Sequence, residues 1–169
     1  AYRAEELESI QIQGVTERYL EFSTFDAERG RMVSPIEISR SRPVALIGWQ
    51  IADRLFGSED PVDKTIKVAG VPFRVVGVSA KKGSFFGNSL DEFVVIPLGK
   101  YQKLFGSRQS LSLLVKPRDP LVLSMARDEA RTALRVSRHL APGDDDNFGI
   151  VASDSILDIF QQATTGIAV

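Results

Sequence analysis

The sequence predicts an α+β fold, because short strand patterns and short helix patterns follow one another along its 169 residues. The clearest signal is a hairpin, in which two β-rich runs, 65–68 and 73–78, flank a short glycine turn. A second signal is the run 43–47, which is apolar throughout and is typical of a strand buried on both faces. With 43% hydrophobic and 25% charged residues, the composition fits one folded domain or two small subdomains.

The elements before the hairpin are predicted in this order. Ile10 and Ile12 alternate with glutamines and indicate a half-buried strand. Residues 16–25 predict a short helix, which Arg-Gly-Arg at 29–31 interrupts. After the buried strand 43–47, an amphipathic helix begins at Gly48 and ends at Gly57. Its apolar positions share one face and are Ile51, Ala52, Leu55 and Phe56.

After the hairpin, residues 81–90 predict a loop and 93–96 another strand. A short amphipathic helix then runs from Leu98 to a glycine stop at Gly106. Leu111, Leu113 and Val115 alternate with other residues and predict a strand. The longest helix is predicted to start near Asp119-Pro120, because aspartate is a good N-cap and proline suits the first turn. A loop at 142–146, a strand at 148–151 and a last helix from 153 complete the prediction.

Composition excludes several functions. The chain has no cysteine, which rules out disulfides, thiol catalysis and cysteine-bound zinc. Its net charge of -1, from 21 basic and 22 acidic side chains, argues against nucleic-acid binding. No signal peptide is visible, and no apolar stretch approaches the roughly 20 residues that span a bilayer.

Two segments contain residues typical of a catalytic or phosphate-binding site, but their context favours a structural role. His139 is the only histidine, and a Ser-His-Asp hydrolase could be drawn through it. No G-x-S-x-G elbow accompanies it, and its place at the end of the long helix suits a cation that opposes the helix dipole. The glycine-rich run 83–88 is no phosphate loop, because its lysines, Lys81 and Lys82, precede the glycines.

The same loop holds Phe85 and Phe86, for which two interpretations stay open. Two adjacent phenylalanines in a polar loop cannot easily both point inward. The segment is therefore either a mobile loop or a partner-contact loop, the second because aromatic residues are enriched at interfaces.

A cluster of arginines on the long helix also has two possible interpretations. The long helix carries four arginines on one face, Arg127, Arg131, Arg135 and Arg138. They form either a solvated face or a docking surface for an acidic partner. Residues 144–146, three aspartates in a row, lack the spacing of a calcium loop and predict a solvated turn.

The central block resembles the periplasmic core domain of MacB-like and FtsX-like ABC transporter permeases. The matching motifs are V-A-L-I-G at 44–48, L-F-G at 55–57, D-P-V-D-K-T-I at 60–66, F-R-V-V-G-V at 73–78 and D-E-F-V-V-I-P at 91–97. Asp63 replaces the usual glycine of the third motif. If that position has a positive φ, aspartate is among the better-tolerated substitutes.

The resemblance implies a porter-like α/β subdomain, residues 1–35 and 97–169, with a stalk helix at its C-terminal end. A smaller, strand-rich (Sabre-like) subdomain, residues 36–96, would be inserted between its parts. The domain would lie outside the cytoplasmic membrane, anchored to it in the full-length protein, and would carry no catalytic, cofactor or metal site. ATP would be used by a separate nucleotide-binding domain.

The implied function is to transmit ATP-driven movement to a substrate or partner, in export, lipoprotein release or hydrolase activation. Partners would be the ATPase, a second permease copy, and an adaptor, lipoprotein or peptide, but not nucleic acid. Candidate partner-binding residues are Lys81, Lys82, Phe85, Phe86, Arg127 and Arg131. The alternatives are a free-standing extracytoplasmic peptide- or protein-binding module and a small hydrolase that uses His139.

Overall fold

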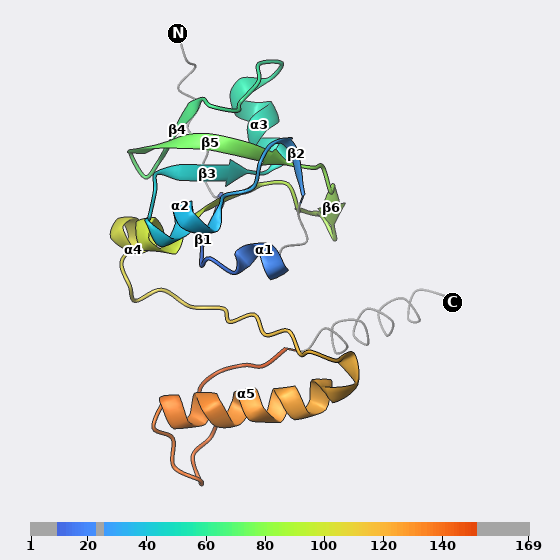
Figure 1. The fold of residues 1–169 in the computed structure, drawn as a ribbon, viewed down its shortest axis with the longest axis vertical. Coiled ribbons are helices and arrows are strands. Elements are labelled where there is room, and N and C mark those ends of the chain that lie inside the picture. The colour runs from blue at the N-terminus through green and yellow to red at the C-terminus, as the bar shows by residue number, and fades with distance from the viewer. Residues whose placement is uncertain (1–9, 23–25, 152–169) are drawn as a thin grey trace, which may run out of the picture. The chain divides into compact units, whose positions relative to one another are not determined.

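The computed structural model describes residues 10–22 and 26–151, and its contacts divide the chain into two units, 1–114 and 115–169 (Figure 1). The first unit is built on a six-stranded sheet with the order β1-β8-β3-β5-β2, in which β4 also pairs with β5. Its strands are β1 (Gln11–Val15), β2 (Ala27–Gly30), β3 (Val44–Ile47), β4 (Thr65–Val68), β5 (Val71–Ser79) and β8 (Phe93–Pro97). Its helices are α1 (Tyr19–Phe22), α2 (Pro35–Ser39), α3 (Trp49–Phe56) and α4 (Leu98–Phe105). The α+β prediction is confirmed.

The sheet is mixed, and its strands come from distant parts of the chain. β1 runs parallel to β8 and β3 parallel to β5, whereas β3–β8, β4–β5 and β2–β5 are antiparallel. β5 is long enough to pair with β4 at its start and β2 at its end. β3 is buried at every residue, as its apolar run predicts.

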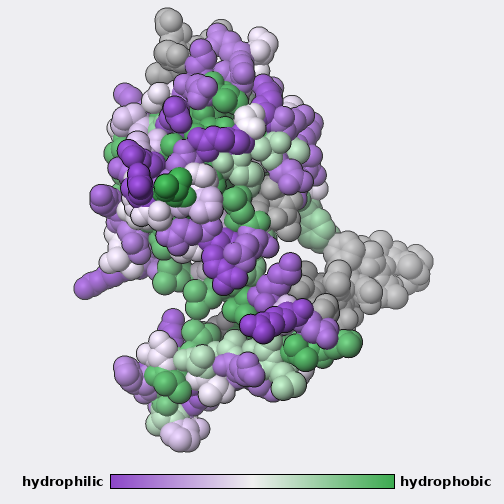
Figure 2. Space-filling model, in the orientation of Figure 1, coloured by the Kyte–Doolittle hydropathy of each residue, from purple (hydrophilic) through white to green (hydrophobic). Residues whose placement is uncertain are grey.

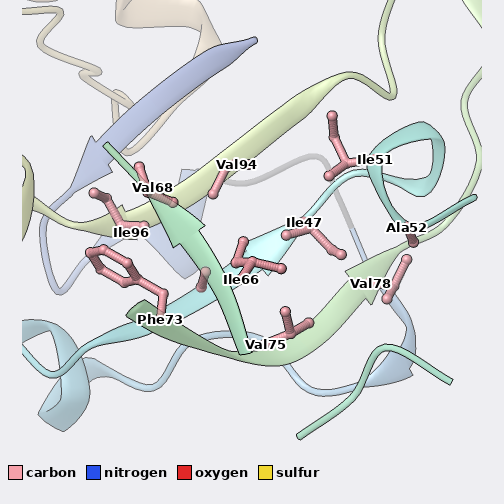
Figure 3. Packing of buried hydrophobic residues seen from close by; sticks show 11 residues of the cluster. Ile47, Ile51, Ala52, Ile66, Val68, Phe73, Val75, Val78, Val94 and Ile96 are labelled. Carbon is pink, nitrogen blue, oxygen red and sulfur yellow. The ribbon is translucent and has the colours of Figure 1, made fainter. Parts of the chain in front are cut away.

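Two hydrophobic clusters cover the two faces of this sheet. Ala45 and Ile47 belong to one cluster, and Val44 and Leu46 to the other, because successive side chains of a strand point to opposite faces. Figure 3 shows the first cluster, in which Phe73 and its strand neighbours pack toward Ile47 and Ile96. α3 and α4 contribute partly buried apolar residues to it, including Leu55 and Tyr101.

Most local predictions for this unit are confirmed, but three elements were not predicted: β2, α2 and the small hairpin in the loop 81–90. β2 was not predicted, because its Arg29-Gly30 is typical of a turn that ends a helix. Gly30 has φ +69 and packs against the carbonyl of Val76. The loop 81–90 contains a small hairpin, β6 (Ser84–Phe85) and β7 (Asn88–Ser89). Asp63 has φ +66, so the aspartate does stand at a left-handed position.

The second unit contains η1 (Pro120–Val122) and α5 (Leu123–Ser137). The helix starts three residues after the predicted proline, and Asp119 instead caps the preceding turn by accepting a bond from the Leu121 amide at 3.0 Å. The strand predictions at 111–115 and 148–151 are wrong: neither segment pairs with a described strand. Leu111 and Leu113 are 71% and 70% exposed, so the alternating pattern does not bury one face of this segment. The helix predicted from 153 lies outside the described residues.

The predicted subdomain boundaries, 35/36 and 96/97, stay a prediction. Within the described sheet, β1 and β2 come from before residue 36 and pair with β8 and β5, which belong to the segment 36–96 apart from Pro97.

Glu37 in α2 gives a first prediction, on acid stability. Its carboxylate accepts two bonds from Arg31 (2.8 and 2.7 Å) and closes a capping box with Ser34. These bonds, those from Arg31 above all, lower the pKa of Glu37 from 4.5 to about 2. Because the folded-state pKa is the lower one, this stabilisation is complete above about pH 4.5 and is lost as the pH falls toward 2.

Glu37→Gln should therefore lower the free energy of unfolding by about 1–2 kcal/mol at pH 7, a value kept small because Arg31 is half exposed. The difference from wild type should shrink steadily in urea unfolding below pH 4.5. Glu59→Gln, at an exposed carboxylate, is the control. A pH-independent difference would mean that lost packing, and not the ion pair, is responsible.

Candidate partner-contact site

The hairpin β6–β7 presents two phenylalanines at its tip. Phe85 pairs with Asn88, which leaves Phe86-Gly87 as a two-residue turn. Both turn residues have positive φ, +49 for Phe86 and +79 for Gly87, as a type I′ turn requires. Asn and Gly are the usual residues there, and a bulky side chain at positive φ costs about 1 kcal/mol or more. The fold thus keeps an aromatic residue where a smaller one would be more stable.

Both rings are exposed and contact each other. Phe86 is 73% and Phe85 48% exposed, and their ring centroids lie 4.5 Å apart in an edge-to-face arrangement. Leu90, at the other end of the hairpin, is also exposed. This geometry agrees with the expectation that the two rings cannot both point inward.

The base of the hairpin is held by a buried carboxylate, which sequence analysis did not single out. Asp91 is 2% exposed, and its two oxygens accept bonds from the amides of Lys82 and Gly83, each at 2.7 Å. The amide of Leu90 also donates to the carbonyl of Gly83, at 2.9 Å. A carboxylate that accepts backbone amides makes strong, charge-assisted bonds. Asp91 therefore fixes both ends of the segment 83–90.

The same residue connects the hairpin to α3. The backbone carbonyl of Asp91 accepts a bond from the amide of Gln50 at 3.1 Å, in the first turn of that helix. Ser89 Oγ donates to Gln50 Oε1 at 2.5 Å. Gly48 makes this close approach possible, because a Cβ there would lie 2.1 Å from the Asp91 carbonyl oxygen. The hairpin and the residues that follow it are thus joined to the first turn of α3 by two hydrogen bonds, both to Gln50.

The two lysines predicted as partner-binding residues, Lys81 and Lys82, lie at the base of this hairpin. The ammonium of Lys81 lies 4.2 Å from the ring centroid of Trp49, a cation–π contact. Lys82 is held through its amide by Asp91. The structure therefore brings Lys81, Lys82, Phe85 and Phe86 into one segment whose base is fixed and whose tip is aromatic.

Arg127 and Arg131 lie on α5, in the other unit. Arg131 and Arg135 both form ion pairs with Asp146, at 3.3 and 2.5 Å. Arg135 also donates to the carbonyls of Ala141 and Asp144. Three of the four arginines therefore bind the turn that follows the helix, since Arg138 also contacts Asn147. The expectation of a solvated turn at 144–146 is corrected for Asp146, whose charge is paired.

His139 follows the last turn of α5, as expected, with φ +55. Within the described part of the chain its ring has no hydrogen-bond partner, whereas a catalytic triad requires two. No group of three His, Asp or Glu side chains gathers as metal ligands among the described residues. Hydrophobic side chains reach the visible surface of the α5 unit in Figure 2, and α5 itself has no buried residue.

Comparison with known proteins identifies the domain. The sequence profile of the MacB-like periplasmic core domain matches residues 1–133. The chain belongs to this family. Its fold agrees with two solved structures. One is the periplasmic region of MacB from Actinobacillus actinomycetemcomitans, with a TM-score of 0.71, 19% identity, and coverage of 95% of this chain and 70% of that one. The other is the extracellular domain of the noncanonic ABC-type transporter YknZ from Gram-positive bacteria, with a TM-score of 0.67, 20% identity and coverage of 80% and 70%.

Relatives of this MacB-like domain include two macrolide export ATP-binding/permease proteins MacB. The protein from Chlorobaculum tepidum is 31% identical over 84% of this chain, and that from Neisseria meningitidis 30% over 96%. The chain spans only 22–24% of the length of these relatives. The family is a transporter permease domain and not an enzyme class. Among the described helices, none has the length and apolar character needed to cross a bilayer.

Proposed function

We propose that this MacB-like domain is the non-catalytic, extracytoplasmic part of an ABC transporter permease, and that its aromatic hairpin contacts a substrate or partner. ATP would be hydrolysed by a separate nucleotide-binding domain, and the resulting movement would reach the hairpin through the sheet. The observation that supports this role is the pair of exposed rings on a fixed base. Rigid aromatic residues lose little entropy on binding and are enriched at interface centres.

The connection between α3 and the hairpin supports the transmitting role. Movement of α3 would be passed to the hairpin through the bond between the Gln50 amide and the Asp91 carbonyl. Such a contact serves export, lipoprotein release or hydrolase activation equally well. Macrolides, the compounds named for the MacB relatives, are the first substrates to test.

The substitution Phe86→Asn tests whether Phe86 contacts a substrate or partner, because it should remove the ring without destabilising the domain. Asparagine tolerates the positive φ of Phe86, so the melting temperature of the domain should stay the same or rise slightly. Transport by the full-length protein should nevertheless fall about tenfold or more, as expected when an aromatic contact residue is removed. Transport is measured as macrolide tolerance of cells that depend on the transporter, alongside ATPase activity.

Val136→Gln is the matched control, because Val136 is 70% exposed on α5 and lies away from the hairpin in sequence. It should change neither property. Normal transport by a stable Phe86→Asn protein would refute the contact role, and a large loss of stability would show that Phe86 acts in folding.

A further inference from the structure

A second surface of the first unit carries positive charge without acidic partners. It lies where the turn after α2 meets α4: a Cβ on Gly99 would lie 2.0 Å from the hydroxyl oxygen of Ser41. Arg40 and Arg42 flank Ser41. Lys100 and Lys103 follow Gly99 on α4. We call these four cations, Arg40, Arg42, Lys100 and Lys103, the basic patch.

The geometry of α4 places Lys103 on its outer side and Lys100 at the edge of that side. Tyr101, Leu104 and Phe105 pack against the core cluster. At roughly 100° per residue, Lys103 lies opposite these three residues and is exposed, whereas Lys100 lies beside Leu104 and is half-buried. Gly99 lies one turn before Lys103 on the same side of α4. The turn after α2 contacts Gly99, so it places Arg40 and Arg42 next to that side of the helix.

These charges are not neutralised locally. The sequence 93–118 contains no Asp or Glu. Glu37, the acid closest to Arg40 in the chain, is already bonded to Arg31. Among the described residues, no member of the basic patch forms an ion pair, whereas Arg18, Arg31, Arg54 and Arg74 of the same unit all do.

The turn that carries the arginines is fixed in an uncommon conformation. Ser41 has φ +49, and the amides of Ser41 and Arg42 donate to the carbonyls of Ile38 and Glu37 at 3.0 and 2.9 Å. Strained backbone that is held by its surroundings is frequent at functional sites. A fixed turn also reduces the entropy lost when its neighbours bind a ligand.

We propose that the basic patch binds an acidic segment of a protein partner, through carboxylates that approach across α4 and the turn after α2. Arginine guanidinium groups bind carboxylates in bidentate fashion, and lysines add charge. Membrane-binding surfaces combine cations with several exposed large apolar residues. Within α2 and α4, both fully described, Ile36 is the only exposed large apolar residue, which favours a protein partner over lipid.

This site is independent of the aromatic hairpin. The hairpin precedes β8 and the lysines of the basic patch follow it, so the two sites lie at opposite ends of a five-residue strand, roughly 16 Å long. In Figure 1, α4 and β6 accordingly appear on opposite sides of the first unit. Loss of one contact should leave the other intact.

The test measures binding of a fluorescently labelled poly-glutamate peptide to the 169-residue chain at low salt, by anisotropy. Lys100→Glu/Lys103→Glu should weaken binding about tenfold or more, since two attractive charges become repulsive. The control Lys64→Glu/Lys67→Glu makes the same change in net charge on β4 and the residue before it, and should alter binding less than about twofold. Arg40→Gln/Arg42→Gln is a second variant, and tryptophan fluorescence of Trp49 checks folding.

Equal losses in the two lysine double variants would overturn the proposal, because binding would then follow net charge alone. Absence of peptide binding to the wild-type chain would also overturn it. Vesicles of phosphatidylglycerol, compared with phosphatidylcholine, provide the third measurement. If the patch bound anionic vesicles and not the peptide, it would be a lipid surface and the proposed protein partner would be wrong.

Discussion

Replacing Gly77 by alanine should destabilise the first unit by about 3 kcal/mol or more, a large fraction of the roughly 5–15 kcal/mol that typically separates a folded domain from its unfolded state. A Cβ at this position would lie 2.0 Å from the carbonyl oxygen of Arg31 and 3.0 Å from its amide nitrogen. Both are backbone atoms, and the Arg31 amide is itself bonded to the Val76 carbonyl at 2.9 Å. The clash cannot be relieved by a side-chain rotation, so strand β5 or the chain after β2 must move.

The measurement is urea unfolding followed by circular dichroism. Gly143→Ala is the matched control, because a Cβ there meets nothing within 4 Å and the backbone is not left-handed. It should leave the unfolding midpoint unchanged. If Gly77→Ala unfolded at the same urea concentration as Gly143→Ala, the close approach of Arg31 to β5 would be disproved.

Gly77 also shows what the sequence could and could not reveal. The motif F-R-V-V-G-V is recognisable as a strand, and its glycine is anomalous within one. The reason is a long-range contact: β2 lies across β5 at this residue, and the register between β3 and β5 shifts beside it. Period-2 alternation reports a buried face, but it carries no information on which strands become neighbours.

The wrong strand predictions have the same origin. Leu111, Leu113 and Val115 alternate as well as Ile10 and Ile12 do, yet only the latter segment pairs, through β8. A strand forms when another backbone completes its hydrogen bonds, and local sequence does not show whether that backbone is present. Helices satisfy their own backbone, which explains why α3, α4 and α5 were predicted within a few residues.

For the candidate site, the exposure of the two phenylalanine rings could be predicted from the sequence, but the hydrogen bonds that fix the base of the hairpin could not. Two phenylalanines beside glycines in a polar segment indicate an exposed tip. The fixing residue, Asp91, looks like an ordinary polar residue before a strand, and its burial becomes visible only when the segment closes over it. Arg131 and Arg135 show the reverse: from the sequence their charges fit either a solvated face or a docking face, and the structure pairs both with Asp146, eleven residues after Arg135.

Asp91→Ala should release the hairpin while leaving the sheet folded. The change removes both acceptors from the amides of Lys82 and Gly83, bonds of a type worth about 1.5–3 kcal/mol each, and leaves a cavity at a 2%-exposed site. We expect a loss of about 3 kcal/mol or more. Amide hydrogen exchange should accelerate most at Lys82, Gly83 and Leu90, and Trp49 fluorescence should change as Lys81 leaves its ring.

Glu92→Ala is the control, because the neighbouring acid forms only a partly exposed ion pair with Arg54 and should cost less than about 1 kcal/mol. Asp91→Asn keeps one carbonyl acceptor and should fall between the two. Asp91→Ala leaves Phe85 and Phe86 in the chain, so transport by the full-length protein separates two explanations. A loss of transport would mean that the rings act only when their base is fixed. Unchanged transport with accelerated exchange would mean that a loose aromatic segment is sufficient.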